Sequence, residues 1–347
     1  MVSLELKRAQ RILKGENITV LPDFFLDVII NPHMSYKDLI EGIQEIYERG
    51  GGNLLGPRIN YVFGGNGGNV AKTLGGLGAQ TTFITKTSVL GKILVEHFLH
   101  PLGVSTYIDS TGEIASSVVL EIPEGGQKRN VMLSWAGSVA QFSAKELTET
   151  QWEVLRASRL IAITNAQNQQ LEGLTAKILS EISPNTGVSV DFSDLSPHLH
   201  RVKGFRERLL DHPVRPPSWV IGNETEIRIL TQLSSGPAQA GIQNLSSEYP
   251  ETSFALHTSR EAQLWSGGEM MANVPCFKIN VHRATGAGDA WHAGFLIGIN
   301  LQLSHEDVLK VANATAAYQI STGNIGSLAQ VVHFAQRTDV YTKSDCY

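Results

Sequence analysis

The second half of the chain alternates short apolar runs with helical stretches, and this alternation limits the possible folds more than any other feature of the sequence. The apolar runs, each typical of a buried strand, lie at residues 160–163, 188–190, 219–221 and 254–256. Helical stretches separate them at residues 171–182 and around 205–210. Strands that alternate with helices predict a mainly parallel sheet with helices on both faces. We therefore expect a doubly wound α/β core whose site lies at the carboxyl ends of its strands.

The first half of the chain adds β-rich segments to this core. Residues 18–21 and 24–30 predict an opening strand that carries Asp23 and Asp27 near its end. Residues 116–122 and 130–135 flank a proline and two glycines, which predicts a hairpin. The expected division is an α/β core at 16–30, 64–103 and 136–335, a small β-rich lid at 31–63 and 104–135, and terminal extensions at 1–15 and 336–347.

Composition and charge exclude several classes of function. The 28 basic and 33 acidic residues give a net charge of -5, and no long run of Lys or Arg could follow a phosphate backbone, so we expect no nucleic-acid partner. The N-terminus lacks the apolar core of a signal peptide. Cys276 and Cys346 suggest neither a disulfide framework nor a thiolate zinc site. We expect a cytoplasmic protein that does not associate with membranes.

The clearest chemical signal lies at residues 277–297. Alternating apolar residues at 277–281 predict a strand, which a loop connects to a helix that opens at Asp289. The small loop residues Gly286, Ala287 and Gly288 let the backbone approach a ligand closely, and N–H groups at a helix N-terminus attract negative charge. The loop therefore predicts an anion site that can stabilise a phosphoryl group during transfer.

Asp289 stands where this anion site begins. A carboxylate there is a poor phosphate ligand because like charges repel, but it can accept the proton of an attacking hydroxyl. The alternative is that Asp289 only caps the helix, which is the commoner use of an aspartate after a glycine turn. The loop alone leaves both interpretations open.

A second glycine-rich loop reads Gly64-Gly65-Asn66-Gly67-Gly68-Asn69-Val70-Ala71. Together with the Asp289 loop and its continuation to Gly294, it resembles the paired signatures of the ribokinase-like (PfkB) family of carbohydrate and nucleoside kinases. The resemblance implies a ribokinase-like fold and transfer of the γ-phosphate of ATP to a hydroxyl of a sugar or other small polyol. The alternative for this loop is a turn needed only for tight strand-to-helix packing.

The resemblance also implies which residues hold the substrate. Gly64, Gly65 and Asn69 match positions that contact substrate hydroxyls in the family. The substrate aspartate at the end of the first strand matches Asp27, with Asp23 as the rival position. Either aspartate could instead be a solvated carboxylate in a turn.

Further positions resemble the nucleotide site of the family. Asn223 and Glu226 match an Asn-x-x-Glu element that organises Mg²⁺ and the phosphates, with Glu226 acting through water. Asn313 matches the C-terminal helix that closes the adenine pocket. His257 and Ser259 lie where the family has a threonine and two glycines along the nucleotide. Because Ser259 departs from that pattern, ADP or another triphosphate stays open as an alternative to ATP.

Departures from the family pattern motivate further expectations. Arg283 and Ala284 replace an Asp-Thr pair whose aspartate often belongs to a monovalent-cation site, so we expect no monovalent cation. The departures also motivate an alternative function, a non-catalytic sensor that binds a sugar or nucleoside. A nucleoside kinase is a further alternative, because sequence does not identify the acceptor. Open strand edges in the lid would allow a homodimer.

Overall fold

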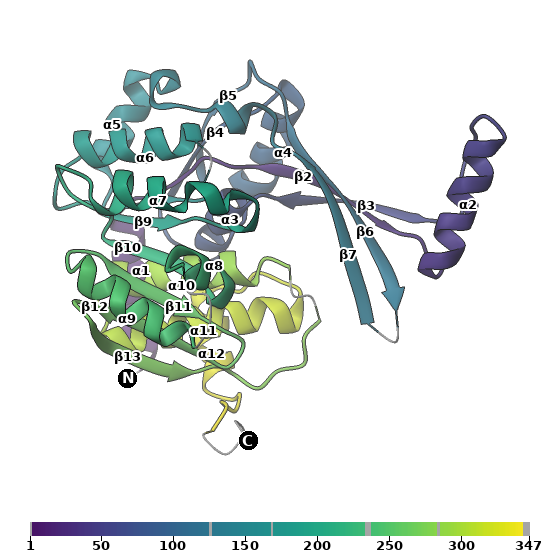
Figure 1. The fold of residues 1–347 in the computed structure, drawn as a ribbon. Helices are drawn as coiled ribbons and strands as arrows, with labels where there is room; N and C mark the ends of the chain where they lie inside the picture. Colours follow the sequence, from purple (N-terminus) through teal and green to yellow (C-terminus); the bar gives the residue numbers. More distant parts are fainter. Residues whose placement is uncertain (1, 125–126, 168, 233–236, 283–284, 343–347) are drawn as a thin grey trace.

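A computed structural model of the protein describes residues 2–124, 127–167, 169–232, 237–282 and 285–342 (Figure 1). Its main sheet has nine strands in the order β13-β12-β11-β10-β9-β8-β1-β4-β5. Their bounds, in the same order, are Glu269–Pro275, Glu261–Ser266, Ser253–His257, Trp219–Asn223, Gly187–Asp191, Leu160–Ile163, Ile18–Leu21, Thr81–Lys86 and Ser105–Asp109. Neighbours from β11 to β5 pair in parallel, whereas β12 and β13 add an antiparallel edge. The expected doubly wound, mainly parallel sheet is confirmed.

The two faces of this sheet bury different helices. Strand β8 shows the principle, because Ile161 and Ile163 enter one core while Leu160 and Ala162 enter the other, as the two-residue period of a strand requires. The first face packs on α5 (Glu149–Ala157), α6 (Gln169–Glu181), α7 (Val202–Phe205), α8 (Glu224–Leu230) and α9 (Ala238–Glu248). The second packs on α1 (Val2–Gly15), α3 (Asn66–Leu77), α4 (Val89–Leu99), α10 (Ala287–Asn300), α11 (His305–Thr322) and α12 (Leu328–Ala335).

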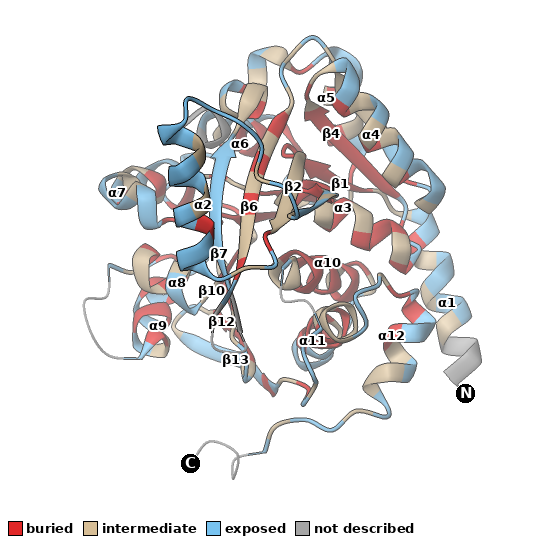
Figure 2. Ribbon diagram, turned by 90° about the vertical axis from the view of Figure 1, so that its right-hand side faces the viewer, coloured by how far each residue is buried: buried red, intermediate tan, exposed pale blue. Residues whose placement is uncertain are grey.

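A small second sheet projects from the core and forms the lid (Figure 1). Its order is β3-β2-β6-β7, with bounds Arg58–Gly64, Phe25–Asn31, Ala115–Glu124 and Gln127–Trp135. Helix α2 (Tyr36–Glu48) lies beyond the sheet, between β2 and β3 in the chain. The predicted hairpin is confirmed, because β6 and β7 pair antiparallel. Figure 2 shows that α2 and β7 are largely exposed, whereas β4 in the main sheet is buried.

Some strands differ from the sequence-based expectation. The segment 24–30 does not continue β1; Pro22 and the buried Asp23 separate them, and β2 pairs with β3 and β6 in the lid. Strand β5, expected in the lid segment 104–135, joins β4 in the main sheet. The alternating residues 277–281 form no strand, because Phe277 turns inward and only bridges Val340.

Helix ends follow the local sequence more closely. Helix α11 begins after Ser304, whose hydroxyl accepts the Asp307 N–H at 3.3 Å, and ends at Gly323 in the left-handed region. Both ends were expected from the sequence. None of the helices in the described part of the chain combines the length and apolar character needed to cross a membrane.

Gly65 provides a test of how the first glycine loop is built. Its φ is +84°, and an added Cβ would lie 2.8 Å from the Asp23 carbonyl oxygen and from the Phe25 nitrogen. We therefore expect Gly65→Ala to lower the free energy of unfolding by at least about 2 kcal/mol. Gly173 is the matched control, because it lies in α6 with no atom within 4 Å of an added Cβ. Gly173→Ala should be neutral or stabilise by about 0.5–1 kcal/mol. Urea unfolding measures both, and equal stability of the two variants would show that the loop has room for a side chain at Gly65.

Candidate active site

The candidate site lies where α10 begins. Gly286 is the N-cap of this helix, with φ +81°, a left-handed conformation that favours glycine. The N–H groups of Ala287, Gly288 and Asp289 follow in the first turn, where an α-helix offers no internal partner. They form a cradle of donors at the positive end of the helix dipole. Among the described residues 285–289, the N–H groups thus lie where an anion site was expected, and anion binding there stays a prediction.

Asp289 connects this cradle to the first glycine loop. Its side chain is buried in the first turn of α10, and Asn69 Nδ2 donates a hydrogen bond to Asp289 Oδ2 at 2.8 Å. Asn69 lies in the first turn of α3, which packs on α10. The two loops that carry the family signatures are thus joined at the buried Asp289 carboxylate.

Electrostatics keep Asp289 readily protonated. Burial raises its pKa well above the ordinary value, and the hydrogen bond from Asn69 partly opposes that rise. The negative charges of Asp191, Asp23 and Glu226 raise the pKa further. A base with a raised pKa is a stronger proton acceptor once it is ionised, which suits the activation of an alcohol.

The neighbouring carboxylates are perturbed in the same direction. Burial, with the charge of Asp23, raises the pKa of Asp191 to about 6. Burial, with the charge of Asp191, raises the pKa of Glu226 to about 8. Because each negative charge disfavours the next, a bound cation would stabilise their ionised forms.

The rival substrate positions Asp23 and Asp27 have different surroundings. Asp23 is fully buried, and its carboxylate accepts the N–H groups of Asn66 at 2.7 Å and Gly67 at 3.0 Å, as well as the Thr164 hydroxyl. It holds the glycine loop against the end of β1. Asp27 instead lines a small cavity of about 90 Å³ with Asn69 and Gly286.

The glycines of the first loop are confined by these aspartates. A Cβ at Gly64 would collide with the Asp27 carboxylate. Gly65 lies against the backbone at Asp23 and Phe25. Close packing therefore limits both positions to glycine, and Gly64 lies beside the Asp27 carboxylate of the small cavity, whereas Gly65 lies against the backbone at Asp23.

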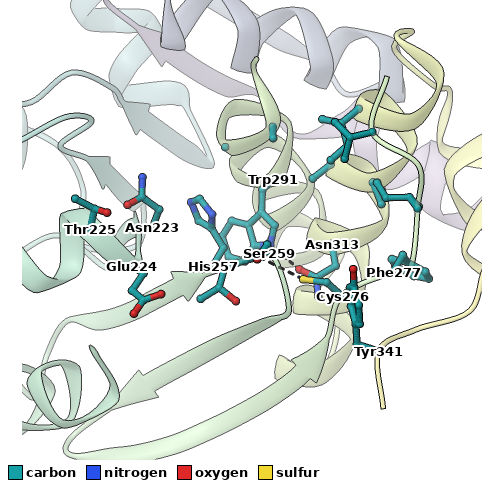
Figure 3. Close-up of a pocket in the computed structure, with 18 residues that line it drawn as sticks. Asn223, Glu224, Thr225, His257, Ser259, Cys276, Phe277, Trp291, Asn313 and Tyr341 are labelled. Atoms are coloured by element: carbon teal, nitrogen blue, oxygen red, sulfur yellow. Dashed lines mark hydrogen bonds between the residues drawn. The ribbon is translucent and has the colours of Figure 1, made fainter. Parts of the chain in front are cut away.

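A larger pocket of about 580 Å³ opens on the other side of the α10 cradle (Figure 3). Its wall contains the expected residues Asn223, His257, Ser259, Gly288 and Asn313. Several apolar side chains complete the wall, namely Phe277, Ile279, Val281, Ala316, Ala317 and Ile320. The size and apolar lining are typical of a small-molecule site.

The polar residues of this pocket differ in what they can offer. The ring of His257 stacks on Trp291 at 5.0 Å and lies within 4.0 Å of an added Cβ at Gly288; burial lowers its pKa to about 4. Asn313 is buried, and its Oδ1 accepts from Trp291 Nε1 at 2.8 Å while its Nδ2 donates to the Pro275 carbonyl at 3.1 Å. Asn313 thus braces the pocket wall.

Asn223 and Glu226 form a reciprocal cap of α8. Asn223 Oδ1 accepts the Glu226 N–H at 3.0 Å, and Glu226 Oε2 accepts the Asn223 N–H at 2.8 Å. Only Asn223 lines the pocket. Among the described residues no three His, Cys, Asp or Glu side chains gather to hold a metal ion.

Some positions lie outside the described residues or carry no prediction from the sequence. Arg283 and Ala284, on which the monovalent-cation expectation depends, lie outside the described residues. Asp191 was missed, although an acidic residue directly after the apolar run 188–190 is a signal for the carboxyl end of a strand. Tyr341, which also lines the pocket, lies in a terminal segment whose sequence gives no such signal.

Comparisons with known proteins identify the family and the fold of the chain. The profile of the pfkB family carbohydrate kinases matches residues 36–330, whereas no curated protein sequence matches the chain. A probable sugar kinase from Rhizobium etli CFN 42 is similar in structure, with a TM-score of 0.73, 18% identity, and coverage of 92% of this chain and 98% of the other. Adenosine kinase from Sinorhizobium meliloti has a TM-score of 0.72 and 19% identity, with coverage of 93% of this chain and 99% of the other. Arabidopsis thaliana ribokinase, solved with ribose and ATP, has a TM-score of 0.72 and 15% identity, with coverage of 92% of this chain and 99% of the other. The fold is thus ribokinase-like, and the chain belongs to the pfkB family of carbohydrate kinases.

Proposed function

We propose that this protein transfers the γ-phosphate of ATP to a hydroxyl of a sugar or sugar-like molecule, with Asp289 as general base. The observation that carries the proposal is the hydrogen bond between Asn69 and Asp289. It joins two glycine loops at the buried Asp289 carboxylate: Asn69 lines a small polar cavity, and Ala287 and Gly288, which precede Asp289 in α10, line a larger apolar pocket. An acceptor in the first and a nucleotide in the second would meet at this carboxylate.

The reaction follows from this placement. Asp289 takes the proton of the acceptor hydroxyl, and the alcohol oxygen attacks the γ-phosphorus as the bond to the ADP oxygen breaks. The N–H groups of residues 286–289 stabilise the charge that develops on the transferred group. Both amide cradle and base belong to one helical turn, so their relative positions are fixed before substrate binds.

Magnesium fits the donors around the pocket. Carboxylate and amide oxygens suit this ion, and it usually retains several waters in phosphate-transfer sites. Glu226 would act through water, since one of its oxygens already caps Asn223. When bound with the nucleotide, the ion would neutralise phosphate charge and favour ionised carboxylates nearby.

The acceptor would lie in the small cavity under the lid. Asp27 and Asn69 line this cavity and offer hydrogen-bonding groups that sugar hydroxyls need, and Gly64, packed against Asp27, and the neighbouring Gly65 would contact the acceptor from the loop beside it. Closure of the lid would exclude water and suppress hydrolysis of ATP.

We also propose that two lids pair in a homodimer, because exposed apolar residues such as Leu133 and Trp135 lie on the edge strand β7.

Asparagine substitution tests the base. Asp289→Asn should lower kcat by about 10²–10⁴-fold, because the amide keeps the shape of the carboxylate but cannot accept the proton. Asp307→Asn is the matched control, since Asp307 is an exposed aspartate in the first turn of α11. Coupled ADP release over pentoses, hexoses, keto-deoxy acids and nucleosides measures both. If Asp289 only capped its helix, the two variants would keep similar activity.

A pair of variants tests the electrostatics of the base through pH. Asp289 must be ionised to act, so kcat/KM should fall at acidic pH, at a higher pH than for an ordinary carboxylate. Asn69→Ala removes a hydrogen bond that favours the ionised form and should move this fall to higher pH. Asp191→Asn removes a like charge and should move it to lower pH.

Opposite shifts in these two pH profiles are the distinctive result. The charged neighbours that act on Asp289 are Asp191 at the end of β9, Asp23 after β1 and Glu226 in α8. A profile that neither variant moves would show that another group limits the acidic rate.

A further inference from the structure

The C-terminal segment after α12 returns to the larger pocket. Its backbone pairs with the stretch that follows β13, because the Lys278 N–H donates to the Asp339 carbonyl at 2.7 Å and the Tyr341 N–H donates to the Cys276 carbonyl at 2.9 Å. Phe277 and Val340 form the antiparallel bridge between them. The tail is therefore attached to the pocket wall by regular backbone hydrogen bonds.

This attachment places an aromatic ring at the pocket. Tyr341 is half-buried, and in Figure 3 its side chain lies beside Cys276, on the opposite side of the pocket from Asn223 and Thr225. Two cations accompany the ring, with Arg260 at 5.7 Å and Lys278 at 5.9 Å from its centroid. Such contacts restrict an aromatic side chain that would otherwise be mobile near a chain end.

Tyr341 also lines a second cavity next to the pocket. That cavity has about 620 Å³ and shares Glu224, Thr258, Ser259 and Tyr341 with the first. Truncation of the tyrosine would remove part of the boundary between the two. The side chain thus limits the space available to a ligand in the first pocket.

The other residues that line the first pocket leave contact with an aromatic ring as a way to bind a planar base. Asn313, the buried amide of the pocket, already bonds Trp291 and Pro275. Much of the remaining lining consists of apolar side chains, such as Phe277, Ile279 and Ile320. A planar base in this space gains its binding energy mainly from shape and contact with apolar and aromatic surfaces.

We infer that Tyr341 forms a wall of the donor site and binds the nucleobase, so that the C-terminal tail is part of the nucleotide pocket. The inference rests on the proposed function, which assigns this pocket to the nucleotide. The base packs against the Tyr341 ring while the phosphates reach the cradle at Gly288. The tail thereby sets donor affinity and leaves the chemistry at Asp289 unchanged.

Binding of a non-hydrolysable ATP analogue with Mg²⁺, measured by calorimetry without an acceptor, tests this inference. Tyr341→Ala should weaken binding about tenfold, since contact of a base with an aromatic ring contributes on this scale. Tyr341→Phe keeps the ring and should stay within about twofold of the wild type. Tyr341→Leu keeps an apolar side chain without the ring and should behave like Tyr341→Ala. Tyr47→Ala, at an 83% exposed tyrosine of α2, is the control.

The outcomes separate this inference from the proposed function. If the wild type binds the analogue and Tyr341→Ala and Tyr341→Leu bind it equally well, the inference is overturned. If Tyr341→Phe is as weak as Tyr341→Ala, with thermal melting unchanged, the ring is not the binding element and the inference is overturned too. Wild-type binding that needs the ring, combined with no phosphate transfer to any acceptor, would support the inference and contradict the kinase proposal.

Discussion

The hydrogen bond between Asn69 and Asp289 is the contact on which the site depends. It spans 220 positions of the chain and is possible only because α3 and α10 pack side by side on one face of the sheet. Buried residues such as Val70 and Leu296 belong to the same core cluster and fix the two helices. Their N-termini consequently meet at the carboxyl ends of the strands, where doubly wound sheets bind ligands.

The same convergence crowds carboxylates into a poorly solvated space. Asp23, Asp191, Glu226 and Asp289 approach the site from separate elements, and burial raises the pKa of each. Such an arrangement destabilises the ionised protein but favours a bound cation, such as the magnesium ion that accompanies a nucleotide. Asp23 serves a structural purpose within this group, because its oxygens hold the N–H groups of Asn66 and Gly67.

Sequence was sufficient for the parts of the fold that local periodicity determines. The parallel strands, the β6–β7 hairpin and both ends of α11 follow from apolar runs, turn residues and caps. The sequence was insufficient where the structure depends on pairing between segments that lie far apart in the chain. Strand β2 pairs within the lid because β3 and β6 provide partners, and residues 277–281 form only an isolated bridge, between Phe277 and Val340.

The site shows the same division. Gly286, Asp289 and Asn69 were identified by motif, and their meeting is a property of helix packing that no local pattern contains. Asp191 was missed although it directly follows an apolar run, whereas Tyr341 was missed because its place depends on a distant contact, the hydrogen bond from its N–H to the Cys276 carbonyl. Asn223 and Glu226 form a reciprocal cap of α8, and the magnesium and phosphate role expected of them stays a prediction.

Transfer of label from ATP radiolabelled in its γ-phosphate tests the central claim most directly. The purified protein would be incubated with magnesium and a panel of pentoses, hexoses, keto-deoxy acids and nucleosides, and the products separated. We predict that label appears on a hydroxyl of at least one acceptor, with one ADP released for each phosphate transferred. An acceptor that binds tightly, yet receives label from neither ATP nor any other donor, would contradict the kinase proposal and favour a sensor that retains the fold without the reaction.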